Sequence, residues 1–131
     1  MARYFTYIDD LVEAIERLVD IVPGEENRVA AGAVTDTLSA NAPYRVVNIA
    51  GGQPIPLMDF IATVESCVGE KAMLNMMEMQ PGDVPQTYAD PALLRALTGY
   101  TPGTSLKAGV GHFVDWFLDY YKPDKTTVDR N

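Results

Sequence analysis

Apolar residues recur every three or four positions in three segments of this chain, and this periodicity limits its possible folds more than any other feature. The pattern predicts amphipathic helices at 9–22, 57–70 and 105–122. Their apolar faces consist of Leu11, Ala14, Ile15, Leu18 and Val22 in the first, Leu57, Phe60, Ile61, Val64 and Val68 in the second, and Leu106, Val110, Phe113, Phe117 and Tyr120 in the third.

Residues that begin and end helices flank these segments and add a fourth helix. Asp9 or Asp10 is suited to cap the first helix, because a carboxylate is favoured near the positive end of the helix dipole. Asp90 precedes a proline and Gly99 follows the last apolar residue, which predicts a short helix at 91–99.

Only two short segments have the composition of β-strands, so the chain cannot build a complete sheet by itself. Residues 44–50 and 71–79 are predicted as strands, and residues 3–8 as an extended entry segment. Residues 24–43 show no periodicity and are predicted as a long, exposed loop. Two strands do not easily form an independent sheet. The sequence therefore predicts a small, helix-rich α/β domain whose sheet is partly missing or is completed by another chain.

Length and composition narrow the class of protein. The 131 residues fit one domain, 47% of them are apolar, and the net charge of −8 comes without a basic cluster. These values argue against nucleic acid or an anionic membrane as a partner. The N-terminal sequence lacks the basic flank and apolar stretch of a signal peptide, and the single cysteine, Cys67, excludes an internal disulfide. We therefore expect a cytoplasmic protein with one domain at 1–122 and a polar tail at 123–131.

The residues by themselves define no active site. Tyr121 and Lys125 have the spacing of a Tyr/Lys proton-transfer pair, but Pro123 between them disrupts the required helical turn. The glycines from Gly109 onward lie inside a predicted helix without a preceding strand, so they favour close helix packing over a phosphate-binding loop. His112 is the only histidine and has no partners for a metal site. We therefore predict no catalytic, cofactor-binding or metal-binding residue.

Three segments in the same order and spacing carry a resemblance to a known family. They are RYFTYIDDLVEAI from Arg3, YRVVNIAGGQPIPLMDFI from Tyr44 and MQPGDVPQTYAD from Met79. Together they resemble the C-terminal part of sugar-nucleotide epimerases of the extended short-chain dehydrogenase/reductase family, and they are most similar to NAD-dependent UDP-glucuronate 4-epimerases. The final segment, SLKAGVGHFVDWFLDYY, is similar to the closing helix of the family. The resemblance covers nearly all of residues 3–122.

The resemblance implies the C-terminal lobe of such an enzyme, rich in helix, with few short strands and no complete Rossmann fold. In the family, the N-terminal Rossmann domain binds NAD and carries the catalytic Ser/Thr and the Tyr-x-x-x-Lys pair. That domain removes a hydride from the sugar, and the keto sugar turns before the hydride returns. The C-terminal lobe meanwhile holds the UDP group of the UDP-sugar. We therefore expect NAD in the parent enzyme and no cofactor in this chain.

The resemblance assigns substrate-binding positions to five residues: Arg3, Phe5, Leu57, Gln80 and Asp83. Arg3 matches an arginine that contacts the diphosphate, a task suited to a guanidinium group. Phe5 and Leu57 match residues beside the nucleotide and its base. Asp83 matches a carboxylate that accepts hydrogen bonds from the ribose.

Two positions depart from the family pattern. Tyr4 stands where the family has an aspartate that supports the arginine, and Gln80 stands where many relatives have a phosphate-binding arginine. We therefore expect the contacts to the diphosphate to differ from those in many relatives.

Three hypotheses follow for the function. The first is the UDP-sugar-binding lobe of an epimerase, and the second is a stand-alone interaction module that has kept the fold without the ligand. The third is a lobe of a related nucleotide-sugar decarboxylase or dehydratase. Because the surface that meets the Rossmann domain would be exposed, we also expect a homo-oligomer.

Overall fold

The computed structural model describes residues 2–30, 32, 34–51, 53–78, 80–82, 87 and 89–121. In chain order the elements are β1 (Ala2–Arg3), α1 (Ile8–Val19), the 3-10 helix η1 (Glu25–Asn27), β2 (Ile55–Pro56), α2 (Leu57–Val68), α3 (Ala92–Thr98) and α4 (Leu106–Tyr121).

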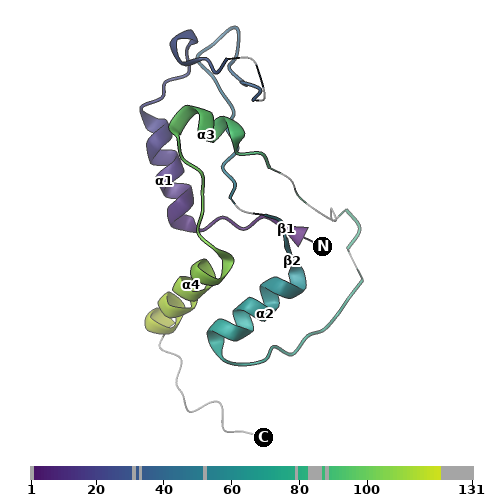
Figure 1. Ribbon diagram of the computed structural model, residues 1–131. Helices are drawn as coiled ribbons and strands as arrows, with labels where there is room; N and C mark the ends of the chain where they lie inside the picture. Colours follow the sequence, from purple (N-terminus) through teal and green to yellow (C-terminus); the bar gives the residue numbers. More distant parts are fainter. Residues whose placement is uncertain are drawn as a thin grey trace, which may run out of the picture.

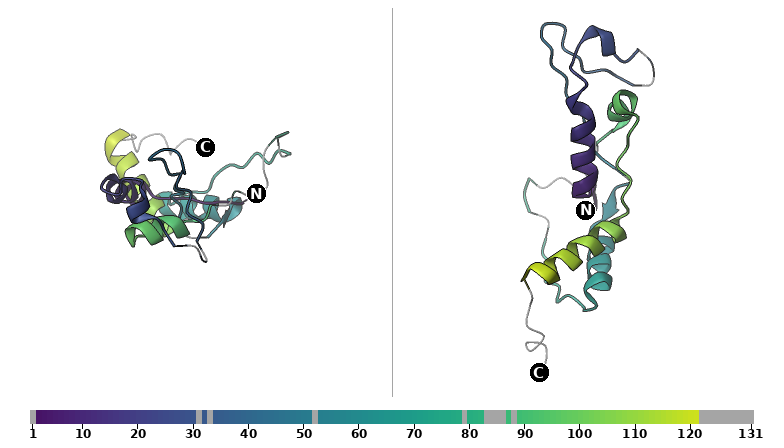
Figure 2. Two further views of the ribbon diagram at one scale, coloured as in Figure 1. Left: turned by 90° about the horizontal axis from the view of Figure 1, so that it is seen from above. Right: turned by 90° about the vertical axis from the view of Figure 1, so that its left-hand side faces the viewer.

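The helices pack in two pairs along an elongated molecule (Figures 1 and 2). Helix α1 lies against α3, helix α2 lies against α4, and the short β1–β2 ladder lies between the two pairs. The predicted fold class, a small helix-rich lobe with few short strands, is confirmed. No helix within the described ranges is long and apolar enough to cross a membrane.

Two helices end, and two begin, at residues that the sequence predicts. Helix α2 stops at Gly69, which adopts the left-handed conformation with φ of 85°, and α3 stops at Gly99 with φ of 70°. The Asp90 carboxylate accepts a hydrogen bond of 2.8 Å from the Ala92 amide and so caps the start of α3. In α4 the Ser105 hydroxyl accepts a bond of 3.3 Å from the backbone amide three residues on.

Helix α1 differs from its prediction at both ends. It ends at Val19 instead of residue 22, and Tyr7 takes the N-cap position without a side-chain cap. Asp9 and Asp10 lie in the first turn, where their charge suits the helix dipole. Neither caps the helix, because Asp10 instead binds Tyr100 and the chain just before α4.

Both strand predictions are wrong for this chain, because no ladder forms at 44–50 or at the described residues of 71–79. At 44–50, the side-chain hydroxyl of Thr37 occupies both backbone groups of Val46, at 2.5 and 3.1 Å. Side chains alternate there between exposed and half-buried, as in a strand with one covered face, but no second strand lies alongside within the described residues. Segment 71–78 is exposed throughout, so its apolar side chains lie largely open to solvent.

The long loop at 24–43 is folded around a buried ion pair, contrary to the prediction that it is simply exposed. Arg45 binds Asp36 through two nitrogens, at 2.9 and 3.1 Å, and their side chains are only 2% and 5% exposed. The same guanidinium donates to the side-chain and backbone oxygens of Asn27. The amides of Val29 and Leu38 donate to the Asp36 carboxylate. The loop is thereby tied to the start of segment 44–50.

The hydrophobic core is small. Among the described residues, the buried hydrophobic ones are Ala14, Ala50, Leu93, Leu94 and Val114. Most of them lie at the α1–α3 contact, so the upper pair of helices in Figure 1 is held by a few side chains. A domain with so little buried apolar area depends strongly on each core residue.

Candidate functional site

The β1–β2 ladder brings two of the predicted binding residues close together. Ala2 pairs with Pro56 and Arg3 pairs with Ile55 in antiparallel register. Leu57 follows directly as the first residue of α2 and is 42% exposed. Arg3 is half-buried, and one of its guanidinium nitrogens donates to the carbonyl of the preceding residue at 3.1 Å. The ladder therefore sets Arg3 beside the start of α2.

Phe5 joins the same region through an aromatic contact. Its ring stacks on that of Phe60, with centroids 4.4 Å apart and planes within 6° of each other. Phe60 lies three residues after Leu57, which places both on one side of α2. Three of the five predicted residues, Arg3, Phe5 and Leu57, are thus grouped around the ladder and the first turn of α2.

The other two predicted residues are not brought into this group by the described contacts. Gln80 is exposed and precedes a turn at Pro81 and Gly82, where Gly82 has a φ of 92°. It belongs to the long segment between α2 and α3, which runs along one side of the molecule in Figure 1. Asp83 lies outside the described residues.

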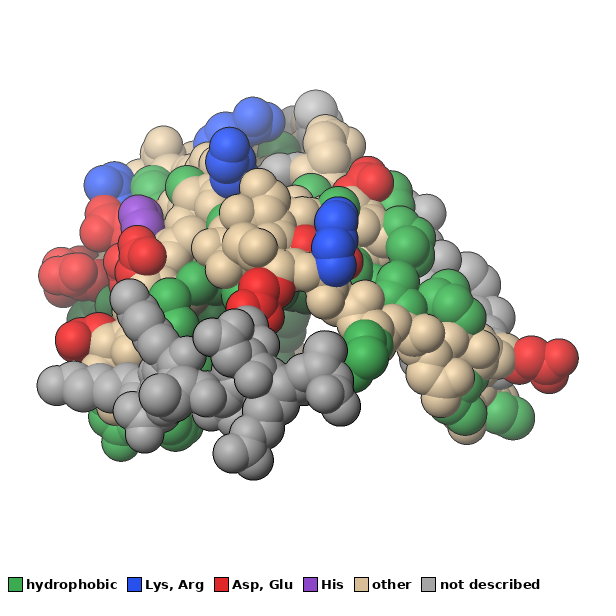
Figure 3. Space-filling model, turned by 90° about the horizontal axis from the view of Figure 1, so that it is seen from below, with side chains coloured by type: hydrophobic (Ala, Val, Ile, Leu, Met, Phe, Trp, Pro, Cys, Tyr) green, Lys and Arg blue, Asp and Glu red, His purple; other side chains and the backbone are tan. Residues whose placement is uncertain are grey.

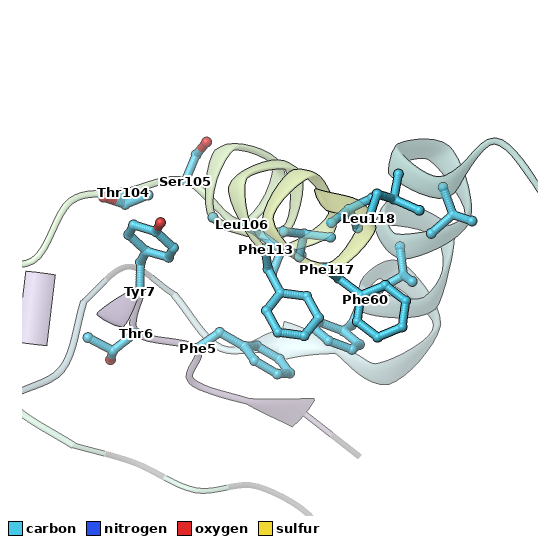
Figure 4. A pocket seen from close by; sticks show the side chains of 15 residues that line it. Phe5, Thr6, Tyr7, Phe60, Thr104, Ser105, Leu106, Phe113, Phe117 and Leu118 are labelled. Carbon is cyan, nitrogen blue, oxygen red and sulfur yellow. The ribbon is translucent and has the colours of Figure 1, made fainter. Parts of the chain in front are cut away.

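An apolar groove of about 680 Å³ opens beside this group, between α2, α4 and residues 5–7. Figure 4 shows the rings of Phe5, Phe60, Phe113 and Phe117 around the hollow. None of the described residues that line it is charged. Periodicity marked Phe60, Phe113 and Phe117 as apolar helix faces but gave no sign that they remain partly open to solvent. The density of aromatic residues in α4 was the only feature of the sequence that indicated this groove.

A carboxylate fixes one end of the groove. Asp10 accepts hydrogen bonds of 3.1 Å from the Tyr100 hydroxyl and 2.8 Å from the Thr104 amide. Burial opposes ionisation of Asp10, but the hydrogen bonds from Thr104 and Tyr100 outweigh it and hold the pKa of its carboxyl below the usual value. Burial, reinforced by the Asp10 charge, raises the pKa of Tyr100. Asp10 therefore ties the start of α1 to the chain that enters α4.

Close packing at the same end uses a glycine. A side-chain carbon at Gly109 would lie 3.1 Å from the Tyr7 ring, so glycine lets α4 approach residue 7 closely. The neighbouring His112 ring lies 5.5 Å from Tyr7 and packs against it. This agrees with the prediction that Gly109 serves close helix packing.

A second, more polar hollow of about 430 Å³ lies near β1. Tyr4, Gln53, Asp90 and Arg95 are among the residues that line it. Successive side chains of an extended chain point to opposite sides, so Tyr4 is directed away from its neighbours Arg3 and Phe5. Within the described ranges no group of three His, Cys, Asp or Glu residues is arranged to hold a metal ion.

Comparison with known proteins shows which proteins this chain is similar to. No family model matches the chain. A probable UDP-glucuronate 4-epimerase of Rhizobium meliloti is 57% identical over 128 residues, which are 98% of this chain and 38% of that protein. Protein CapI of Staphylococcus aureus is 47% identical, covering 93% and 36%. UDP-glucuronate 4-epimerase 4 of Arabidopsis thaliana is 35% identical, covering 99% and 29%.

Solved structures agree with these relatives. The crystal structure of a Bacillus cereus UDP-glucuronic acid 4-epimerase in complex with NAD has a TM-score of 0.66 and 26% identity, over 95% of this chain and 32% of that one. A complex of the same enzyme with UDP-glucuronic acid and NAD has a TM-score of 0.65. In each case the chain spans less than two fifths of the relative.

The fold and the relatives together define the class. The chain is similar to a C-terminal fragment of the UDP-glucuronate 4-epimerases, and its described residues form a helix-rich lobe without a complete Rossmann fold. Within that class it is homologous, over nearly its whole length, to part of the UDP-glucuronate 4-epimerases.

Proposed function

We propose that this chain is the part of an NAD-dependent UDP-sugar epimerase that holds the nucleotide. The grouping of Arg3, Phe5 and Leu57 around the β1–β2 ladder is the observation that best supports this role. A guanidinium group for the diphosphate and two apolar side chains for the base are the groups that a nucleotide requires. Gln80 and Asp83 are proposed to complete the site from the segment between α2 and α3.

In this proposal one part of the enzyme holds the nucleotide, and another part carries out the reaction on the sugar. A remote group that is bound equally well in all states anchors the ligand and leaves the sugar ring free to turn. The chain's own residues would therefore bind and orient the substrate, and hydride and proton transfer would take place on the NAD-binding part of the parent enzyme. The single free cysteine, Cys67, supports a cytoplasmic location.

The exposed side of α1 is the proposed contact with that other part of the parent enzyme. Ile8, Val12, Ile15 and Val19 are each at least half exposed and form one stripe along the helix. Segment 44–50 adds further exposed apolar side chains with the alternation of a strand. A neighbouring strand that paired with 44–50 and packed under α1 would cover both features.

Weak, localised binding of UDP is the first expected result. In nuclear magnetic resonance titrations of the purified chain, UDP should bind with millimolar affinity and shift the amide signals of residues 3–5 and 57–60. The affinity is low because only part of the site is present to compensate for the entropy lost on binding. Arg3→Ala should abolish these shifts.

Arg28→Ala is the matched control, because Arg28 is exposed and pairs with Glu25 on the distant loop. It should leave the UDP shifts unchanged. Shifts spread over unrelated surfaces, or an unchanged response in Arg3→Ala, would remove the support for this site. Micromolar affinity would instead show that the lobe is fully preorganised without its partner.

The chain alone should neither bind NAD nor convert a UDP-sugar. Among the described residues no strand leads into a glycine-rich loop, and in the sequence Pro123 interrupts the spacing between Tyr121 and Lys125. The resemblance places both groups in the other domain. The measurements are NADH absorbance and chromatography of UDP-glucuronate incubated with NAD. A full-length relative serves as the positive control. Turnover that persists through repeated purification and scales with chain concentration would contradict the assignment.

A further inference from the structure

The stack of Phe5 on Phe60 connects an irregular segment of the chain to a helix. Phe5 lies between β1 and α1, in residues 4–7 that belong to neither element, and it is 37% exposed. An exposed side chain on such a segment changes rotamer readily. The ring of Phe60 lies parallel to that of Phe5, with centroids 4.4 Å apart, and so covers one of its faces. The stack therefore restrains the plane of the Phe5 ring.

Phe60 is suited to restrain its neighbour because helix α2 fixes its own position. It lies in the first turn of α2, and the paired strand β2 leads directly into that turn. Aromatic side chains on a helix adopt only two χ1 rotamers in most cases. Helix α2 in turn packs along α4. The stack thus couples a residue of an irregular segment to a well-fixed helix.

The same helix carries Leu57, the other apolar residue that we propose to lie beside the base. Leu57 and Phe60 are three residues apart, so their side chains lie on the same side of α2. The helix backbone itself places Leu57. Phe5 lies outside the helix, so its orientation relative to Leu57 depends on the contact with Phe60.

The stack lies outside the buried core. Among the described residues, neither Phe5 nor Phe60 belongs to the buried hydrophobic set. Both line the apolar groove, and hydrophobic side chains reach the surface at this end of the molecule in the view from below (Figures 3 and 4). A substitution here avoids most of the cavity cost that it would have in the core. The effect of Phe60 on Phe5 can therefore be tested in a folded chain.

We propose that Phe60 is a positioning residue for the nucleotide: it holds the ring of Phe5 in the orientation in which Phe5 and Leu57 receive the base. Binding costs less conformational entropy when the side chain that meets the ligand is already ordered. Phe60 acts through Phe5 and not through a contact with the ligand. The periodicity marked Phe60 only as part of an apolar helix face. This inference rests on the proposed function, because it takes Phe5 and Leu57 to lie beside the base.

Replacing the Phe60 ring should weaken UDP binding. In the nuclear magnetic resonance titration of the purified chain, Phe60→Leu should raise the dissociation constant of UDP about 2- to 10-fold, the range expected when one side chain must be ordered on binding. Phe60→Met, which also lacks a ring, should act in the same way. Phe60→Tyr keeps the ring and should restore the affinity to within about two-fold. Circular dichroism checks that each variant is folded.

Two further measurements distinguish positioning from a general structural effect. In the unsubstituted chain, ring protons of Phe5 that lie over Phe60 should resonate upfield, and Phe60→Leu should return them to ordinary values. If Phe60 acts through Phe5, Phe60→Leu added to Phe5→Ala should raise the dissociation constant of UDP no further than Phe5→Ala alone.

Phe113→Leu is the matched control, because it removes the same ring from the α4 side of the groove, where Phe113 packs on Trp116 and Phe117. It should leave the UDP affinity unchanged. A loss equal to that of Phe60→Leu would show that the groove as a whole, and not the stack, maintains the site.

Failure of this inference is distinct from failure of the proposed function. UDP binding that Phe60→Leu and Phe60→Met leave unchanged, or that weakens further when Phe60→Leu is added to Phe5→Ala, would overturn the role of Phe60 alone. The absence of UDP shifts in the unsubstituted chain would overturn the proposed function and this inference together.

Discussion

Arg45→Ala should destabilise the chain by about 3–5 kcal/mol, the usual cost of removing one partner of a buried ion pair. The Arg45 side chain is 2% exposed and supplies four hydrogen bonds, two to Asp36 and two to Asn27. Without it, the Asp36 carboxylate stays buried with amide donors but no counter-charge. The free energy of unfolding is measured by urea titration with circular dichroism. It should be measured at low concentration, because self-association stabilises the folded state.

Two controls test the cause of this loss. Arg28→Ala removes an arginine from an exposed ion pair on the same loop and should leave the free energy of unfolding unchanged. Asp36→Ala combined with Arg45→Ala should cost little more than Arg45→Ala alone, because both substitutions remove one interaction. Fully additive losses would show that the two side chains act independently and would contradict the structure of the loop.

Acid should weaken the same interaction. Burial opposes ionisation of Asp36, but hydrogen bonds from the Val29 amide, from Arg45 and from the Leu38 amide, with the Arg45 charge, keep the pKa of its carboxyl below the usual value. A lowered folded-state pKa adds stability above the unfolded value of about 3.9. That stability is lost as the pH falls through the folded value. Asp36→Asn should flatten this part of the stability profile.

The helices were predictable from sequence because their signals are local. Gly69, Gly99 and Asp90 each act within one or two turns, and each ends or begins a helix where the sequence places it. The start of α1 was not predictable in this way. Asp10 has partners about ninety residues away, and a tertiary hydrogen bond outweighs the local preference for capping.

The strand predictions were wrong for a different reason. The ladder joins segments more than fifty residues apart and contains two residues on each side, too few to leave a periodic signal. Segment 44–50 has the composition and the alternating exposure of a strand, but no partner strand lies beside it within the described residues. Segment 44–50 therefore has the local preference for a strand, but the described residues supply no partner strand with which it could form a ladder.

The residues of the candidate site were predicted from the family resemblance and not from the periodicity of the sequence. No periodicity connects Arg3 with Leu57, and the stack of Phe5 on Phe60 joins positions that no local signal relates. The resemblance to the epimerases assigned Arg3, Phe5 and Leu57 to one ligand, and the ladder and the Phe5–Phe60 stack group them around the start of α2. The roles of all five residues, with Gln80 and Asp83 among them, stay predictions.

Leu94→Ala should cost about 2–5 kcal/mol and bring the chain close to unfolding. Leu94 has no exposed surface, and Ala14 is the other described hydrophobic residue with none. Removing buried methyl and methylene groups loses their transfer free energy and leaves a cavity that the surroundings fill only in part. Small domains commonly have only about 5–15 kcal/mol of stability, and this core is small. Thermal and urea unfolding both report the loss.

Leu74→Ala provides the matched control, because it removes the same atoms from a side chain that is 47% exposed in the segment between α2 and α3. It should change the free energy of unfolding by only a few tenths of a kcal/mol. Because α1 packs against α3, the Leu94 variant should also weaken the Asp10–Tyr100 contact, which is one of the hydrogen bonds that lower the pKa of Asp10. Equal effects of the two substitutions would mean that the α1–α3 contact is not the core that stabilises this lobe.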